Sequence, residues 1–93
     1  MEFEWDPKKA ADNLAKHEVS FQEAATVFDD PLSVTVPDPD HSFEESRVII
    51  VGESRRGRLL IVSHAERGDR IRLVSARELT RTERSVYEEG NFD

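Results

Sequence analysis

One histidine, one carboxylate and three arginines lie near the ends of two neighbouring predicted strands. These residues are His64, Glu66, Arg67, Arg72 and Arg77. Metal-free cleavage of RNA needs a base that deprotonates the ribose 2′-hydroxyl, cations that stabilise the phosphorane, and an acid that protonates the leaving 5′-oxygen. The imidazole of His64 suits these proton transfers, and Glu66 could share them. The residues therefore fit ribonuclease chemistry, although a hairpin-turn ion pair of Glu66 with Arg67 or Arg70 explains part of the pattern as well.

The segment from Ile71 to Glu89 predicts how the arginines are held. Alternation along the strand places two sets of side chains on opposite faces. One set is Ile71, Leu73, Ser75 and Arg77, and the other is Arg72, Val74 and Ala76. Thr80 and Glu83 have the spacing of a capping box, which predicts a helix from Thr80 to about Glu89 with Gly90 as its C-cap. Arginines on such rigid elements bind phosphate or carboxylate with little loss of side-chain freedom.

Four residues on the predicted helices could add contacts to RNA. Lys16 and His17 end the first helix, and Arg84 and Tyr87 share one face of the last helix because they lie three residues apart. We expect Tyr87 in the core, and stacking on a nucleobase is the alternative. Cations at a helix C-terminus also offset the helix dipole, so Lys16 and His17 have a structural explanation too.

The acid-rich stretch from Asp38 to Glu45 offers a different chemistry. Its oxygen atoms could hold a hard cation in a metal-dependent hydrolase built around Asp38, Asp40, His41 and Glu45. Pro39 and the lack of a glycine turn do not fit an EF-hand loop. We interpret the stretch as a connection between strands and expect neither a metal nor another cofactor. The sequence contains no glycine-rich phosphate loop and no HExxH motif, which argues against P-loop and zincin enzymes.

Charge is unevenly distributed along the 93 residues. The first 46 residues hold three lysines and twelve Asp or Glu residues, whereas the rest hold ten arginines and eight Asp or Glu residues. The net charge of −7 argues against general affinity for nucleic acid. Arginine without lysine in the second half nevertheless favours bidentate contacts with anions. A solvated surface rich in ion pairs accounts for the same composition.

The length predicts one domain, residues 1–93. The absence of cysteine excludes disulfides and is compatible with a cytoplasmic protein. No apolar run is long enough to span a membrane, and the acidic N-terminus does not have the pattern of a signal peptide. We therefore expect a soluble protein that does not associate with membranes.

Short local patterns predict the order of the elements. Residues 2–6 alternate like an edge strand, and Asp6-Pro7 starts a helix that ends near residues 16–17. The side chains expected to face inward from that helix are Ala10, Ala11 and Leu14. Ser20 and Glu23 predict a second capping box, followed by a helix to Phe28. Strands are expected at 32–36, 47–52, 59–65 and 71–76, with turns at 55–57 and 68–69.

These elements predict an α+β fold. A short antiparallel sheet of about four strands, with the N-terminal strand at its edge, should carry two N-terminal helices and one C-terminal helix. The C-terminal helix has few apolar residues, chiefly Val86 and Tyr87, so it should pack weakly on the rest of the domain.

Five stretches resemble the BrnT family of bacterial type II toxins. They are FEWDPKKAADNLAKH, VSFQEAATVFDDP, HSFEESR, GRLLIVSHAER and IRLVSARELTRTERSVYEE, in family order over nearly the whole chain. The combination of HSxxExR, IRxxSAR and ERxxYE is specific. His41, Glu45 and Arg47 belong to the first of these motifs, which alone gives them no catalytic role.

The resemblance implies a RelE-like fold and an endoribonuclease that inhibits translation until a BrnA-like ribbon-helix-helix antitoxin neutralises it. Promoter DNA would then be reached only through the antitoxin. Carried over to this sequence, the site residues are Glu66, Arg67 and Arg77, with His64, Arg84 and Tyr87 as auxiliary contacts. Two positions depart from the family. Glu18 replaces the usual glycine, so the C-cap must be built differently. Position 64, often aromatic, is histidine, so a catalytic role of His64 is not carried over from the family and rests on its chemistry alone.

Two hypotheses follow from the sequence. The first is a metal-independent endoribonuclease toxin that leaves a 2′,3′-cyclic phosphate. The second is a catalytically inactive interaction module that binds an antitoxin-like partner through its acidic first half and last helix.

Overall fold

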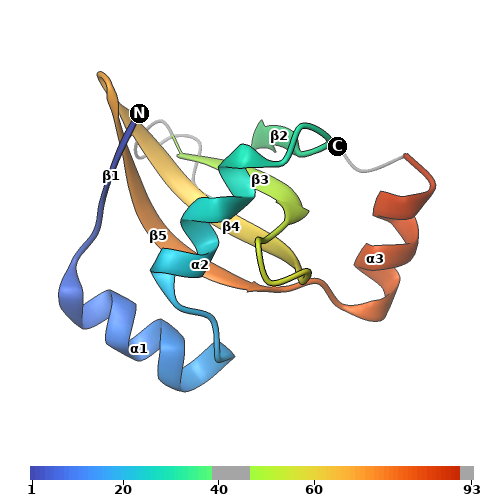
Figure 1. The fold of residues 1–93 in the computed structure, drawn as a ribbon, viewed down its shortest axis with the longest axis horizontal. Helices are drawn as coiled ribbons and strands as arrows, with labels where there is room; N and C mark the ends of the chain where they lie inside the picture. The colour runs from blue at the N-terminus through green and yellow to red at the C-terminus, as the bar shows by residue number, and fades with distance from the viewer. Residues whose placement is uncertain (39–46, 91–93) are drawn as a thin grey trace.

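The computed structural model describes residues 1–38 and 47–90. In chain order the elements are β1 (Glu2–Glu4), α1 (Pro7–His17), α2 (Phe21–Thr26), the 3-10 helix η1 (Val27–Asp29), β2 (Val34–Pro37), β3 (Arg47–Glu53), β4 (Leu59–Arg67), β5 (Arg70–Glu78) and α3 (Arg81–Glu88). The strands form one sheet in the order β1-β5-β4-β3-β2 (Figure 1). The predicted α+β class is confirmed.

The sheet is mixed rather than purely antiparallel. Strands β2 to β5 form the predicted antiparallel meander. Strand β1 lies at the edge, as expected, but pairs with β5 in parallel, with Phe3 opposite Ile71. The parallel pairing follows from the connection, since the chain leaves β1, passes through the helices and the rest of the meander, and returns beside β1 in the same direction.

A β-bulge in β5 changes which side chains share a face. His64 pairs with Leu73 but Ser63 pairs with Ser75, so Val74 is an extra residue. Such an insertion reverses the alternation beyond it. Ile71, Leu73 and Ala76 are consequently the buried residues of β5. The prediction that Ser75 and Arg77 share a face with Ile71 and Leu73 is therefore wrong, and both lie on the opposite face.

The core lies between the sheet and the first two helices, which pack on β5 (Figure 1). Its buried members are Val19, Phe21, Ala24, Val27, Ile50, Leu60, Val62, Ile71, Leu73 and Ala76. Trp5 packs edge-on against Phe21 with ring centroids 5.9 Å apart, and Phe3 packs against Phe28 at 5.1 Å. Trp5 is therefore partly buried against the core.

Helix α1 turns inward only part of the face that was expected, because Ala10 packs against the core but its two predicted companions do not. Ala11 and Leu14 are exposed, whereas Asn13 is buried. The Asn13 amide donates to the carbonyl oxygens of Val19 and Ala76 and accepts from the Ala76 N–H, at 2.8–3.0 Å. An amide with all of these bonds is stable in the interior, because none of its buried polar groups lacks a partner.

The N-caps of α1 and α3 are formed as the sequence predicts, whereas that of α2 is formed only in part. Asp6 caps α1, and Thr80 and Glu83 form a complete capping box on α3. Ser20 caps α2 by accepting from the Glu23 N–H, but the Glu23 carboxylate binds Ser54 and Arg58 instead of returning to the Ser20 N–H. The second capping box is thus only half formed, because a buried ion pair with Arg58 competes for Glu23.

Helix α3 lies at the side of the domain remote from β1 (Figure 1). None of its residues is buried. The Tyr87 hydroxyl donates to the Leu32 carbonyl oxygen at 3.1 Å, and Glu83 binds Arg77 of β5. The expected weak apolar packing is thus observed, and polar contacts hold the helix. No helix in the described part of the chain is both long and apolar enough to cross a membrane.

Candidate functional site

A hollow of about 300 Å³ lies on the face of the sheet opposite Ile71 and Leu73. Strands β3, β4 and β5 form its floor, and the C-terminal end of α1 forms part of its wall. Its polar side chains are His17, Asp38, Arg47, Ser63, Ser75 and Arg77. Two cations, one imidazole, one carboxylate and two hydroxyls thus surround one space.

The strand register explains why these residues meet. Ser63 pairs directly with Ser75, and Ile61 pairs with Arg77, so all four point to the same side. The bulge at Val74 is what turns Ser75 and Arg77 toward the hollow. The Asp38 N–H donates to the Arg47 carbonyl oxygen at 3.2 Å, which extends the β2–β3 pairing and places the largely buried Asp38 in the wall of the hollow.

Arg77 is held in place by α3. Its Nη1 and Nη2 groups donate to the two carboxylate oxygens of Glu83 at 2.8 and 3.0 Å, and Nη1 also donates to the Glu78 carbonyl oxygen. The hydrogen bond from Arg77 is the main reason why the pKa of Glu83 falls to about 2, and the same bond raises the pKa of Arg77. Both groups are therefore ionised near neutral pH.

One edge of the Arg77 guanidinium remains available for a ligand. Arginine has five N–H donors, and the contacts with Glu83 and Glu78 use three of them. Within the part of the chain that the structure describes, the donors on Nε and on one side of Nη2 have no acceptor. These two donors form a fork of the kind that binds phosphate or carboxylate through two hydrogen bonds.

His64, predicted as a catalytic residue, lies in the core instead. Its side chain is only 1% exposed, and its ring packs on Phe28 with centroids 4.8 Å apart. Burial lowers the pKa of His64, because the charged imidazolium is poorly solvated there. Its pairing with Leu73 directs it to the face covered by α2, away from the hollow. This placement argues against the catalytic role, since the ring has no contact with solvent.

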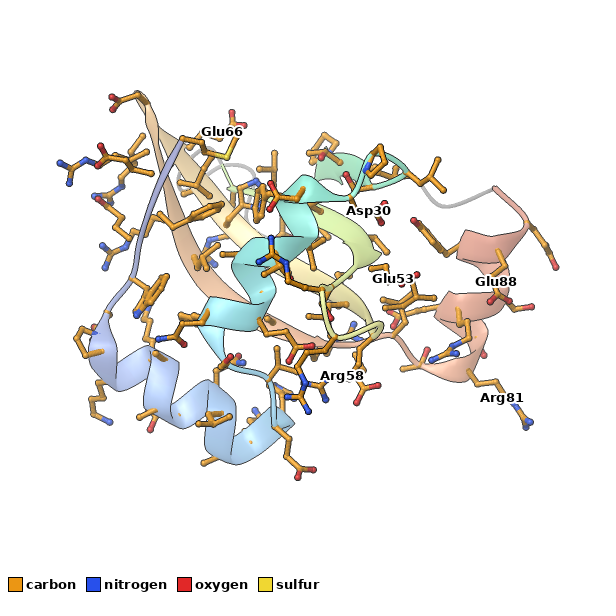
Figure 2. The ribbon with its side chains drawn as sticks, in the orientation of Figure 1. Asp30, Glu53, Arg58, Glu66, Arg81 and Glu88 are labelled. Carbon is orange, nitrogen blue, oxygen red and sulfur yellow. The ribbon has the colours of Figure 1, made fainter. Side chains whose placement is uncertain are left out.

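Glu66 and Arg67 lie at the far end of the β4–β5 hairpin from Arg77. Glu66 pairs with Ile71, whereas Arg77 pairs with Ile61. Glu66 and Ile61 are five positions apart along β4, which is roughly 17 Å at the rise of an antiparallel strand. Glu66 is exposed near the hairpin turn, remote from α3 (Figure 2). The structure thus does not bring together Arg67 and Arg77, which were expected to share a site.

The remaining predicted contacts divide between other surfaces. Arg72 lies beside β1, where its Nη1 is 3.6 Å from Glu4. Arg84 is exposed on α3, and the Tyr87 hydroxyl is bound to Leu32. Burial is the main cause of the raised pKa of Tyr87. Lys16 does not line the hollow but lies beside it, so of the predicted RNA-binding residues only His17 reaches it.

Several residues of the hollow escaped the sequence-based prediction. Ser63 is a polar residue within the apolar run LLIVSHA, and Arg47 starts a strand on the same face as Ile49. A comparison of the alternating faces of the two predicted strands could have placed Ser63 and Arg47 on one side of the sheet. Ser75 was assigned to the apolar face because the bulge has no evident sequence signal, and the pairing of Glu83 with Arg77 depends on how α3 folds back.

The predicted alternative of a metal site rests mostly on residues outside the described part of the chain. Of Asp38, Asp40, His41 and Glu45, only Asp38 is described. Within residues 1–38 and 47–90, no three His, Asp or Glu side chains are grouped closely enough to hold a metal ion.

Comparison with known proteins identifies the family. A family model described as "Ribonuclease toxin, BrnT, of type II toxin-antitoxin system" matches residues 5–83. The crystal structure of the Brucella abortus ribonuclease toxin BrnT has a similar fold, with a TM-score of 0.69 and 20% sequence identity over 87% of this chain and 99% of that one. A search of curated proteins found no significant match. The chain belongs to the BrnT family of ribonuclease toxins of type II toxin–antitoxin systems.

Proposed function

We propose that this protein cleaves RNA at the hollow by metal-independent transphosphorylation. The ribose 2′-oxygen attacks the adjacent phosphorus, the bond from phosphorus to the 5′-oxygen breaks, and a 2′,3′-cyclic phosphate and a 5′-hydroxyl result. The observation that carries this proposal is the available fork of Arg77 in a space that also contains His17.

Each polar residue of the hollow suits one part of this reaction. The Arg77 fork stabilises the charge of the phosphorane, and Arg47 adds a second cation. Histidine is the commonest general acid or base in enzymes, and His17 supplies the imidazole here. The 2′-hydroxyl proton passes to a base, and the leaving oxygen receives a proton from an acid. His17 and Asp38 are the candidates for these two roles.

Glu66, Arg67 and His64 are not part of the site that we propose. Glu66 and Arg67 lie at the other end of the hairpin, and His64 is enclosed by the core. Lys16 is assigned to the edge of the site, and Arg72, Arg84 and Tyr87 to surfaces outside it.

We further propose that cleavage of RNA inhibits translation in the cytoplasm and that a BrnA-like ribbon-helix-helix antitoxin neutralises the toxin. The net charge of −7 supports a basic antitoxin segment as the partner, because charges of opposite sign steer association. The antitoxin, and not the toxin, would bind promoter DNA. We also propose that the fold of this domain is related to that of the RelE toxins. An inactive interaction module is the alternative, favoured by the acidic surface and by the weakly packed α3.

The test is a cleavage assay with labelled RNA in excess EDTA. Wild-type protein should produce 2′,3′-cyclic phosphate ends, and Arg77→Ala should lose activity by about 10²-fold or more. Arg81→Ala is the matched control, because Arg81 is exposed at the start of α3 and points outward (Figure 2). Circular dichroism should show that both variants are folded.

Two results would contradict the proposal. Cleavage that EDTA abolishes would indicate a metal-dependent reaction, and unchanged cleavage by Arg77→Ala would show that the reaction does not occur at the hollow.

Expression of the protein without an antitoxin separates the two functions. Growth arrest that Arg77→Ala relieves requires the enzyme, whereas growth that is unaffected by expression favours the interaction module.

A further inference from the structure

A second hollow, of about 280 Å³, lies between α1 and β5 and adjoins the first. His17, Val74 and Ser75 line both hollows, so the two form one continuous depression around the bulge. The side chains found only in the second hollow are Lys9, Asp12, Asn13 and Lys16. We call this second hollow the α1 groove.

The α1 groove carries positive charge on an otherwise acidic protein. Lys9 and Lys16 are two of the three lysines of the chain, and they are seven positions apart on the helix. They therefore lie on one side of α1, roughly 10 Å apart along its axis. Both are exposed, and neither forms an ion pair with any residue that the structure describes.

The single acid of the groove is already partly neutralised. Asp12 lies 3.4 Å from the third lysine, Lys8, one helical turn earlier. Such an exposed pair contributes little stability, but it reduces the repulsion that Asp12 would exert on an anion. Among the residues that line the groove, the two lysines outnumber the single acid.

The position of α1 beside β5 is fixed rather than variable. Asn13 lies between Lys9 and Lys16 on the helix, and its buried amide makes three hydrogen bonds to Val19 and Ala76. Ala76 is the neighbour of Arg77, so one side chain fixes the helix next to the residue that we assign to the reacting phosphate. Cations at fixed spacing bind a polyanion with a smaller loss of freedom than cations on a flexible loop.

We infer that the α1 groove binds the backbone of single-stranded RNA next to the phosphate held by Arg77, with Lys9 and Lys16 each contacting one flanking phosphate. This inference rests on the proposed function, because the groove leads into the same hollow. A positively charged groove that follows the backbone is the usual means of binding a single strand.

The experiment measures binding, so that it does not depend on cleavage. The ligand is a fluorescent single-stranded RNA of ten nucleotides with 2′-O-methyl riboses, which cannot form the cyclic phosphate. Its Kd is measured by anisotropy from 50 to 200 mM salt for wild type, the double variant Lys9→Gln/Lys16→Gln, and Arg81→Gln as a control that removes one positive charge outside the groove.

Loss of two phosphate contacts has a defined signature. Each contact contributes a slope of about −0.7 to the dependence of log K on log salt, so the double variant should lose about 1.4 of the slope. Over this fourfold range of salt the affinity of wild type should fall roughly sevenfold more than that of the double variant. Arg81→Gln should keep the wild-type slope, and Asp12→Asn should bind more tightly than wild type.

Each possible result either supports or overturns the inference that the α1 groove binds RNA. A slope that is unchanged in the double variant, or lowered equally by Arg81→Gln, overturns the inference, as does a wild type that does not bind the RNA at 50 mM salt. If wild type cleaves RNA but the double variant keeps the slope, the groove is wrong and the proposed function stands. If wild type binds with the expected slopes but cleaves nothing, the groove stands and the proposed reaction fails.

Discussion

The two ends of the β4–β5 hairpin carry the same kinds of side chain in different surroundings. Near the turn, Arg70 and Arg72 lie beside β1, within 3.4–3.6 Å of Glu4. At the other end, Arg77 binds Glu83 through two hydrogen bonds and keeps a second pair of donors available. The first arrangement neutralises cations on an exposed edge, whereas the second orients a cation in a hollow. An arginine near a sheet edge thus acquires a role from its neighbours.

The largest expected effect is on the rate of RNA cleavage, which should depend on Arg77 and not on the arginines near the turn. Arg77→Ala should reduce the rate of RNA cleavage by about 10²-fold or more, because the phosphorane would lose a positioned cation. Arg72→Ala and Arg67→Ala at the turn end should each stay close to the wild-type rate. Initial rates on one labelled RNA measure all three. Equal losses at both ends would contradict the site, and losses only at the turn end would restore the assignment to Glu66 and Arg67.

The next effect is on the free energy of unfolding, which the ion pair of Arg77 should raise in a way that depends on pH. The pKa of Glu83 is about 2 in the folded protein and 4.5 without its partners, so its contribution is present above pH 4.5 and lost as the pH falls toward 2. The pair is partly exposed, and we expect about 2 kcal/mol after solvent screening. Glu83→Gln should remove this contribution in urea denaturation at pH 7, and the difference from wild type should shrink near pH 2.5.

Glu4→Gln is the matched change at the turn end. Its partner Arg70 is 57% exposed, and exposed pairs contribute about 1 kcal/mol or less. A loss in Glu4→Gln as large as that in Glu83→Gln would mean that the two ends do not differ in how firmly they hold arginine.

A smaller effect concerns the buried face of the hairpin. Burial lowers the folded pKa of His64 below 6.5, so the unfolded chain binds a proton more readily and stability falls as the pH drops below 6.5. His64→Phe removes this loss while keeping an aromatic ring against Phe28. We expect it to be more stable than wild type by about 1 kcal/mol at pH 5, measured by urea denaturation, with RNA cleavage retained. A large loss of cleavage with the fold intact would return His64 to the site.

The contrast also explains which features the sequence could predict. The starts of α1 and α3 were placed from Asp6-Pro7 and from Thr80 with Glu83, because caps depend on residues within one turn. The meander was found from runs of apolar residues and turns. The bulge at Val74 depends on how β5 pairs with β4, which local alternation does not contain. Because it reverses the faces, the error extended to Ser75 and Arg77.

Burial of polar residues was the second feature that local patterns missed. Hydrophobic periodicity assigned Leu14 to the inner side of α1, but Asn13 occupies that side because it completes the hydrogen bonds of Ala76 on β5. His64 occurs in an apolar run and fills a core position beside Phe28. In both cases a partner more than 30 residues away in sequence decides the placement.

The smallest effect concerns the cap that joins α1 to α2. Glu18 has φ of 59° and ψ of 32°, so it adopts the left-handed conformation usual for glycine at this position, and its N–H donates to the Leu14 carbonyl oxygen. The expectation of a differently built cap is therefore wrong. A non-glycine residue in this conformation costs about 1 kcal/mol, partly offset by the greater freedom of glycine when unfolded.

Glu18→Gly should consequently stabilise the domain by about 0.5 kcal/mol, measured by urea denaturation. Glu18→Ala is the control, because alanine keeps the strain without the carboxylate. If both variants gain equally, the carboxylate and not the backbone is responsible. Arg58 donates to the Glu18 carbonyl oxygen at 3.0 Å and also binds the buried Glu23, so this cap is held from outside the helix. That support explains how a residue with an unfavourable conformation can end the helix that carries Lys16 and His17.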